Sequence, residues 1–157
     1  MANRARIDTS RPGRHTFKVT ATSRDGQAVT RTVSYFVRFP SNQLLARPKL
    51  KPHSNGVFVV TVKVPWPGRV DILITAWKDN LAGAARLLNP APGRFVFARA
   101  HANPKHKGRL TIVVKPNPRG RRLVAHPRYR VTLRLWISYT PTHGNQHDTG
   151  FYGLHLP

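Results

Sequence analysis

The chain has 157 residues, with 27 Lys and Arg against five Asp, no Glu, and a formal net charge of +22 at pH 7. Without Cys it can form no disulfide, thiolate zinc site, iron–sulfur cluster or cysteine nucleophile, and without Glu it lacks the H-E-x-x-H and EF-hand motifs. No apolar run approaches the length of a membrane span, and the first 20 residues lack a signal-peptide core, so a cytoplasmic, mature or fragmentary chain is expected.

Hydrophobic residues make up 39% of the chain and fall in alternating runs, which indicates a folded β-rich protein rather than a disordered basic chain. The first run, HTFKVTATS, follows a basic stretch over 1–14. The turn-forming pair Asp25-Gly26 comes next, and a second alternating run, AVTRTVSYFVRF, follows it. The sequence therefore predicts a β-hairpin over 15–39.

Pro and basic residues dominate the next stretch, which is predicted to be a linker over 41–55, with Leu44, Leu45 and Leu50 able to add a short edge strand. From Gly56 onward, alternating runs are separated by Pro and Gly turns, a pattern typical of a β-sandwich. These runs cover 56–65, 69–77, 93–101, 109–116 and 129–140.

The alternation also assigns the faces of the strands. In 69–77 the even-numbered residues are expected to face inward, with Asp71, Leu73 and Thr75 outward. The only helical period lies in 80–88, and the stretch 117–128 is predicted to be a basic loop. In the longest run, the residues expected to face inward are Tyr129, Val131, Leu133, Leu135, Ile137 and Tyr139.

Two single residues are given specific structural roles. Tyr129 opens the longest run shortly after Leu123 and Pro127, a spacing that favours a tyrosine corner, in which the hydroxyl bonds to backbone upstream. A plain inward Tyr at a strand start is the alternative. Asp71 is expected to form a surface pair with Arg130 or Arg134 if their strands are neighbours.

Metal and catalytic sites find little support. His143, His147 and Asp148 share one loop and could hold Zn or Ni, but a solvated hairpin turn explains them better. His101 and His106 lie among Lys residues that repel cations. No nucleophile elbow or phosphate-binding Gly motif is present, so no catalytic residue, cofactor or metal ligand is assigned and the chain is predicted not to be an enzyme.

The charge is the strongest functional signal. Arg on a β face beside an aromatic residue is what a binding platform for anionic polymers would use, and 19 of the 27 cations are Arg, which suits bidentate contact with phosphate. A solvated surface from Arg-rich composition is the alternative. The candidate polyanion-binding residues are Lys105, Lys107, Arg109, Arg119, Arg121, Arg122, Arg128, Arg130, Arg134 and Trp136.

Two stretches resemble a known family. The segment IDTSRPGRHTFKVTATSRDGQAVTRTVSYFV is similar to the closing hairpin of bacterial PKD/HYR-type Ig-like repeats. Residues 56–157 more loosely resemble the C-terminal Ig-like domain of secreted or wall-associated actinobacterial proteins. The resemblance implies extracellular Ig-like modules with structural or adhesive roles, and it carries over no catalytic residue. The matching hairpin positions are Ile7 to Ser10, Pro12, Gly13, His15 to Phe17, Val19, Ala21, Gly26, Val33, Tyr35 and Val37.

The combined expectation is an all-β protein: an Ig/fibronectin-III-like β-sandwich over 56–157 with one short helix, preceded by a linker (41–55) and a β-hairpin from a truncated Ig-like repeat (1–40). The favoured function is a non-enzymatic, extracellular or cell-wall-associated structural or adhesion module. The alternative is non-specific binding of nucleic acid or an anionic wall polymer. Expected partners are other Ig-like modules, or copies of the chain that pair through the hairpin strands.

Overall fold

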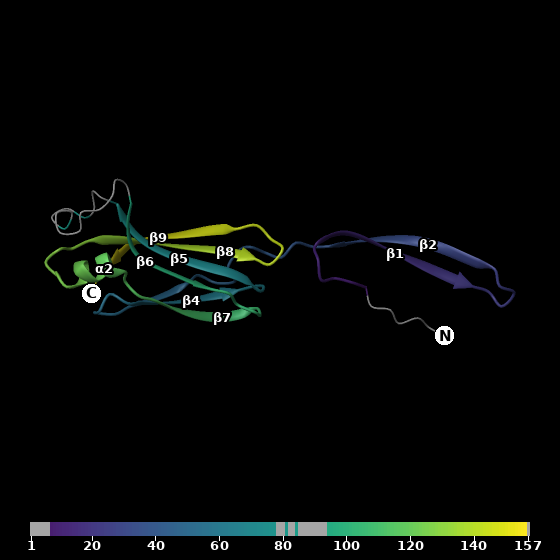
Figure 1. Cartoon of the computed structure of the whole chain (residues 1–157), viewed down its shortest axis with the longest axis horizontal. Helices are drawn as coiled ribbons and strands as arrows, with labels where there is room; N and C mark the ends of the chain where they lie inside the picture. Colours follow the sequence, from purple (N-terminus) through teal and green to yellow (C-terminus); the bar gives the residue numbers. More distant parts are fainter. Residues whose placement is uncertain (1–6, 78–80, 82–83, 85–93, 157) are drawn as a thin grey trace. The chain divides into compact units, whose positions relative to one another are not determined.

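The computed structural model describes residues 7–77, 81, 84 and 94–156, and the chain divides into two compact units, Met1–Pro40 and Ser41–Pro157 (Figure 1). The first unit is the predicted hairpin. Strand β1 (Gly13–Thr22) pairs antiparallel with β2 (Ala28–Val37), from Gly13 opposite Val37 to Thr22 opposite Ala28. Gly26 adopts a positive φ of 86° in the connecting turn, which is why the turn needs glycine there.

An aromatic cluster organises one face of this hairpin. The rings of His15 and Tyr35 stack with their centroids 5.3 Å apart, and Phe17 lies tilted against Tyr35 at 6.0 Å. The Tyr35 hydroxyl donates to the backbone carbonyl of Asp8 at 2.6 Å. This bond ties the segment that precedes β1 to the hairpin.

The second unit confirms the all-β sandwich. One sheet has the order β3-β4-β7 and the other the order β6-β5-β8-β9 (Figure 1). In the constant-type Ig arrangement, the fourth strand pairs in the sheet of the first two, whereas here β6 pairs with β5 in the opposite sheet. The strands are β3 (Lys49–Pro52), β4 (Phe58–Val64), β5 (Gly68–Trp77), β6 (Arg94–Ala102), β7 (Gly108–Val114), β8 (Thr132–Pro141) and β9 (His147–His155).

The core is one cluster between the two sheets, built from the alternating positions that the sequence indicates. Val131 and the alternate residues of β8 from Leu133 to Tyr139 are buried, as predicted. Thr75 was expected to face outward but is only 2% exposed. Its pairing with Arg134 keeps Thr75 on the outward face, so Thr75 is covered there and not turned inward. In the partner strand β6 there is a β-bulge: Ile74 pairs with Ala98 while Thr75 pairs with Val96, so Phe97 is an extra residue and the alternation of β6 is interrupted there.

The stretch predicted to be a linker over 41–55 is instead part of the second unit. Its edge strand β3 pairs with β4, with Leu50 opposite Val60, and the backbone N–H of Leu45 donates to the carbonyl of Lys63 at 2.8 Å. Pro52, at the end of β3, does not prevent this because an edge strand can leave one side of its backbone unpaired, and Pro48 lies just before the strand. Residues 41–55 therefore belong to the sandwich.

The described helix lies where the sequence predicts a basic loop. Helix α2 (Pro118–Val124) begins after the N-cap Asn117, with Pro118 in its first turn, a position that favours proline. The helix predicted over 80–88 falls mostly outside the described residues. Of its expected apolar positions, Leu81 and Ala84 are described and both are buried in the core.

Asn117 joins α2 to the bulge in β6. Its side-chain oxygen accepts from the N–H of Gly120 at 2.7 Å, while its side-chain nitrogen donates to the carbonyl of Val96 at 2.6 Å and its backbone N–H to that of Phe97 at 2.9 Å. Gly120 lies so close that a Cβ would meet the Phe97 carbonyl oxygen at 2.7 Å. The bulge and Asn117 together fix α2 against the end of the sandwich.

The tyrosine-corner assignment was wrong. Tyr129 precedes β8 and is half-buried, and among the described residues its hydroxyl meets the Arg128 guanidinium at 3.2 Å instead of upstream backbone. The tyrosine that pins a connection is Tyr139, at the other end of β8. It is 1% exposed and its hydroxyl donates to the backbone carbonyl of Trp66, in the β4–β5 turn, at 2.7 Å. Burial raises the pKa of the Tyr139 phenol above its usual value.

We predict that Asn117→Ala lowers the free energy of unfolding by about 1–3 kcal/mol, because it removes the helix cap and the bond to Val96 together. Asn117→Asp keeps the oxygen that caps the helix but loses the nitrogen that donates to Val96, so it should lower the free energy of unfolding by less than Asn117→Ala does. Urea denaturation measures both. Asn103→Ala, in the exposed β6–β7 turn, is the matched control, and an equal effect of the two alanine variants would contradict the role given to Asn117.

We further predict that Tyr139→Phe destabilises the protein by about 1 kcal/mol, since it removes a hydrogen bond from a buried hydroxyl. Tyr129→Phe, which removes only a surface contact with Arg128, should change stability by less than about 0.3 kcal/mol. Urea denaturation of the pair compares the same chemical change at two places in one segment. A larger loss of stability for Tyr129→Phe than for Tyr139→Phe would contradict this assignment and favour Tyr129 as the residue that pins a connection.

Candidate functional site

The ten residues predicted to bind anionic polymers divide between the two ends of the sandwich. Lys105, Lys107 and Arg109, hereafter the turn cluster, lie in and just after the β6–β7 turn. The α2 arginines lie at the far end of β7, whose seven residues span roughly 20 Å. The sequence places all ten in one group, whereas the topology separates them.

Backbone hydrogen bonds join the turns at the turn-cluster end. The N–H of Gly68 donates to the carbonyl of Pro104 at 3.1 Å, and that of Thr142 to the carbonyl of Pro67 at 2.9 Å. The bond from Tyr139 to Trp66 closes the same end. This end is therefore a set of mutually bonded turns, with the turn cluster on its exposed surface.

Strand register gathers a second group on the outward face of the four-stranded sheet. Leu73 of β5 pairs with Arg99 of β6 on one side and with Trp136 of β8 on the other, so these three residues form one row. Arg134 lies two residues before Trp136 and on the same face. The Arg94 guanidinium carbon lies 5.2 Å from the centroid of the Trp136 ring, within the range of a cation–π contact.

Arg94 and Arg99 were missed by the sequence prediction. Both lie in the run RFVFARAHA. Arg94 and Arg99 are five positions apart, a spacing that in a regular strand puts two residues on opposite faces, but the extra residue Phe97 between them puts both on the same face. The pairing of each with β5, rather than a local motif, reveals the group.

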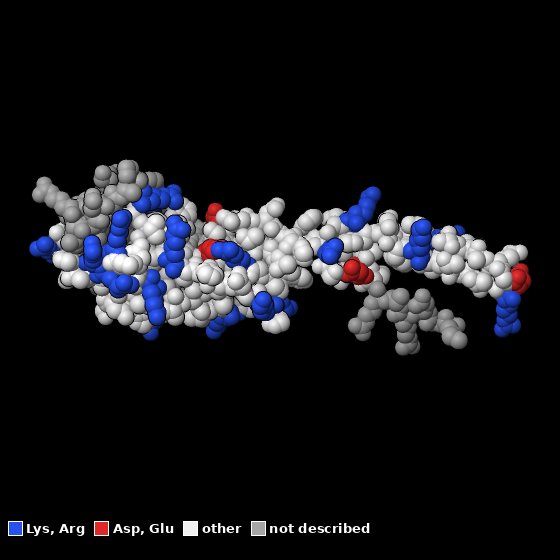
Figure 2. All heavy atoms as spheres, viewed as in Figure 1, with Lys and Arg blue, Asp and Glu red and all other residues white. Residues whose placement is uncertain are grey.

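The segment from α2 to β8 carries the densest charge. Arg119 and Arg122 are exposed on α2, and Arg121 donates to the carbonyl of Pro116 at 3.2 Å. The Arg128 guanidinium carbon lies 5.0 Å from the centroid of the Tyr129 ring. We call the combined group the basic end; it consists of Arg94, Arg99, Arg119, Arg121, Arg122, Arg128, Arg130, Arg134 and Trp136. Figure 2 shows Lys and Arg side chains gathered over the half of the sandwich that carries α2.

The acidic residues of the sheet lie in the row next to Trp136 on the same face. Asp71 pairs across the strands with Ser138, and Ser138 with Asp148, one row beyond Trp136. The expected pair of Asp71 with Arg130 or Arg134 does not form, because the register puts Thr75 opposite Arg134. Asp71 instead accepts two hydrogen bonds from Arg69, at 2.7 and 2.8 Å, the one ion pair recorded among the described residues.

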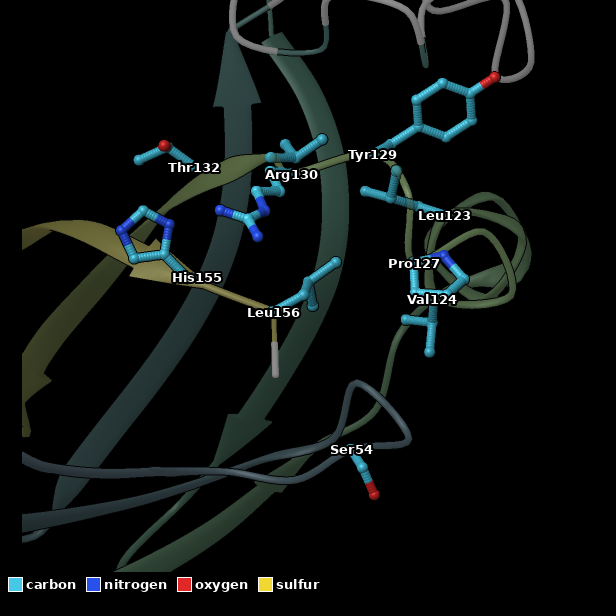
Figure 3. Close-up of a pocket in the computed structure, with 10 residues that line it drawn as sticks. Ser54, Leu123, Val124, Pro127, Tyr129, Arg130, Thr132, His155 and Leu156 are labelled. Carbon is cyan, nitrogen blue, oxygen red and sulfur yellow. The ribbon is translucent and has the colours of Figure 1, made fainter.

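A pocket of about 590 Å³ opens at the α2 end of the sandwich (Figure 3). Leu123 and Val131 are buried in its wall, while Arg130 and His155 are exposed. Figure 3 shows the Arg130 and His155 side chains extending into the same part of the pocket, with Leu123 and Leu156 facing them and the Tyr129 hydroxyl directed away. The remaining lining residues are Ser54, Val124, Pro127 and Thr132.

Other site types find no geometric support in the described ranges. In 7–77, 81, 84 and 94–156, no three His, Cys, Asp or Glu side chains are grouped to hold a metal ion. His143 lies in the β8–β9 turn, whereas His147 and Asp148 begin β9, where Asp148 accepts from Gln146 at 2.8 Å. Within the same residues, no helix has the length and apolarity to cross a membrane.

Comparison with known protein families, curated proteins and solved structures finds no match for this chain.

Proposed function

We propose that the chain is a non-enzymatic Ig-like module of the cell exterior that attaches to extended anionic polymers through the basic end. One observation carries the proposal: residues 119–134 contain six Arg and no acidic residue, and helix α2 in this stretch packs at β6, the strand that carries Arg94 and Arg99. The extracellular or cell-wall setting rests on the resemblance of residues 7–37 to Ig-like repeats.

The chemistry of the basic end suits phosphate-bearing polymers such as nucleic acid or an anionic wall polymer. Arg guanidinium groups bind phosphate oxygens in pairs, and the release of condensed counterions makes such binding favourable and strongly dependent on salt. An aromatic ring beside Arg adds a stacking surface that does not discriminate sequence. The expected binding is therefore tight at low salt and indifferent to sequence.

Salt screens the positive charges of α2 from those of the turn cluster. The α2 arginines and the turn cluster are roughly 20 Å apart along β7, whereas the Debye length at physiological ionic strength is about 8 Å. A polymer bound at one end consequently gains little from charge at the other. This separation allows a charge-matched experiment.

We predict that Arg99→Gln/Arg119→Gln/Arg122→Gln weakens binding of a labelled oligothymidylate at least about tenfold and reduces the slope of log affinity against log salt by about 2. These three Arg are exposed, so the fold should be kept. The control Lys105→Gln/Lys107→Gln/Arg109→Gln removes the same charge from the turn cluster and should change affinity less than about threefold. Fluorescence anisotropy at several salt concentrations measures both.

Equal losses in the two triple variants would show that net charge alone drives binding and would contradict the basic end as an interface. Binding that survives half-molar salt, or that prefers one base sequence, would also contradict the proposal. Competition by heparin should displace the oligothymidylate in every variant that binds it.

We also propose that the hairpin unit pairs with another copy of the chain. Its face with Phe17 and Tyr35 is apolar apart from His15 and Arg31, and Val19, Val29 and Val33 on that face are 49%, 63% and 42% exposed. Two-stranded sheets are marginal alone, and the outer edges of β1 and β2 pair with no strand among the described residues. A second copy offers the same edge and the same apolar face.

The full chain should therefore associate reversibly as concentration rises, which sedimentation velocity detects. Val33→Lys puts a charge on the apolar face and should make the chain monomeric. Thr32→Lys adds the same charge to the opposite face and should leave association intact. A monomeric full chain at all concentrations, or equal effects of the two Lys variants, would overturn this pairing.

A further inference from the structure

We infer that the pocket at the α2 end binds a small amphiphilic anion, with an apolar body and a carboxylate or a similar planar anionic head. Binding there does not rest on polymer attachment, although Arg130 belongs both to the pocket and to the basic end. Its volume of about 590 Å³ falls within the range of small-molecule sites, and five of its ten lining residues are apolar.

The wall chemistry selects the body of the ligand. Leu123 and Val131 are 1% and 2% exposed, and Val124, Leu156 and Pro127 continue the apolar lining. A hydrated polymer chain gains nothing from such a wall, whereas an aromatic or aliphatic body gains from leaving water. The pocket therefore favours an apolar ligand body over a polyphosphate segment.

The polar groups select the head. Arg130 brings a guanidinium fork, which binds a carboxylate with two parallel hydrogen bonds, and none of the described lining residues is acidic. His155, on the neighbouring strand β9, adds a ring N–H in the same part of the pocket (Figure 3). The Ser54 hydroxyl points away from this group in Figure 3. One end of the pocket thus offers N–H donors to an anion, and Leu123, Val131 and Leu156 offer an apolar wall beside it.

The neighbouring Arg128 provides an internal control. It is two residues from Arg130, is also exposed, and lies over the Tyr129 ring instead of lining the pocket. Substitution of either Arg by Gln changes the net charge equally. Only Arg130→Gln removes a group from the pocket.

The test uses 1-naphthoate as the anionic probe and 1-naphthalenemethanol as its neutral counterpart, with the full-length protein, followed by calorimetry and by amide NMR shifts. We expect 1-naphthoate to bind and to shift the amides of Leu123, Val131 and Leu156. Arg130→Gln should weaken 1-naphthoate binding about tenfold or more, and Arg128→Gln less than about twofold. Binding of the neutral alcohol should be weaker and unchanged in both variants.

Three results would overturn the inference: no binding of 1-naphthoate, equal weakening by the two Arg variants, or shifts confined to residues outside the pocket. Measuring oligothymidylate affinity in the same variants tests polymer binding independently of the pocket. Both single variants remove one surface charge and should weaken oligothymidylate binding alike, so failure of the pocket leaves polymer binding intact and failure of polymer binding leaves the pocket intact.

Discussion

The extra residue at Phe97 in β6 is the constraint on which the functional end of the molecule depends. The bulge leaves the carbonyls of Val96 and Phe97 available to a group from outside the sheet, and Asn117 takes both. Asn117 also caps α2, so the side chain and backbone of this one residue join the bulge in β6 to the first turn of the helix. Through α2, this junction places Leu123 in the pocket wall and Arg119 and Arg122 on the surface. A helix of seven residues has little stability of its own, so its contacts with the rest of the sandwich stabilise it.

The fold separates apolar burial from charge. The core is a single cluster of aliphatic and aromatic side chains, and the described ion pair, Arg69 with Asp71, lies at the exposed surface. Residues 119–134 contribute six Arg and no acidic residue, so these positive charges repel one another. Such repulsion costs stability, and a bound polyanion would relieve it. The stability of the sandwich and its affinity for polyanions are therefore linked through the same side chains.

The strands could be predicted because alternation is a local signal: the pattern of β8 and the turn at Asp25-Gly26 both specify structure within a few residues. Helix α2 was missed because seven residues with three Arg show no helical period, although Asn117 followed by Pro118 is a recognisable helix start. The choice of Tyr139 over Tyr129, and of Arg69 as the partner of Asp71, depends on register and turn contacts across the chain. For the site, the charges were visible in the sequence, but their division between two ends follows from topology, and Arg94 and Arg99 were concealed by the bulge.

Native-state hydrogen exchange at the amides of Asn117 and Gly120 tests the central claim most directly. The first donates to the Phe97 carbonyl at 2.9 Å and the second to the Asn117 side chain at 2.7 Å. If the bulge and Asn117 anchor α2, both amides should be protected to about the same degree as the paired amides of β6. Exchange of both at the rate of an unstructured peptide, with β6 still protected, would show that α2 is not anchored and would contradict the account of how the basic end and its pocket are built.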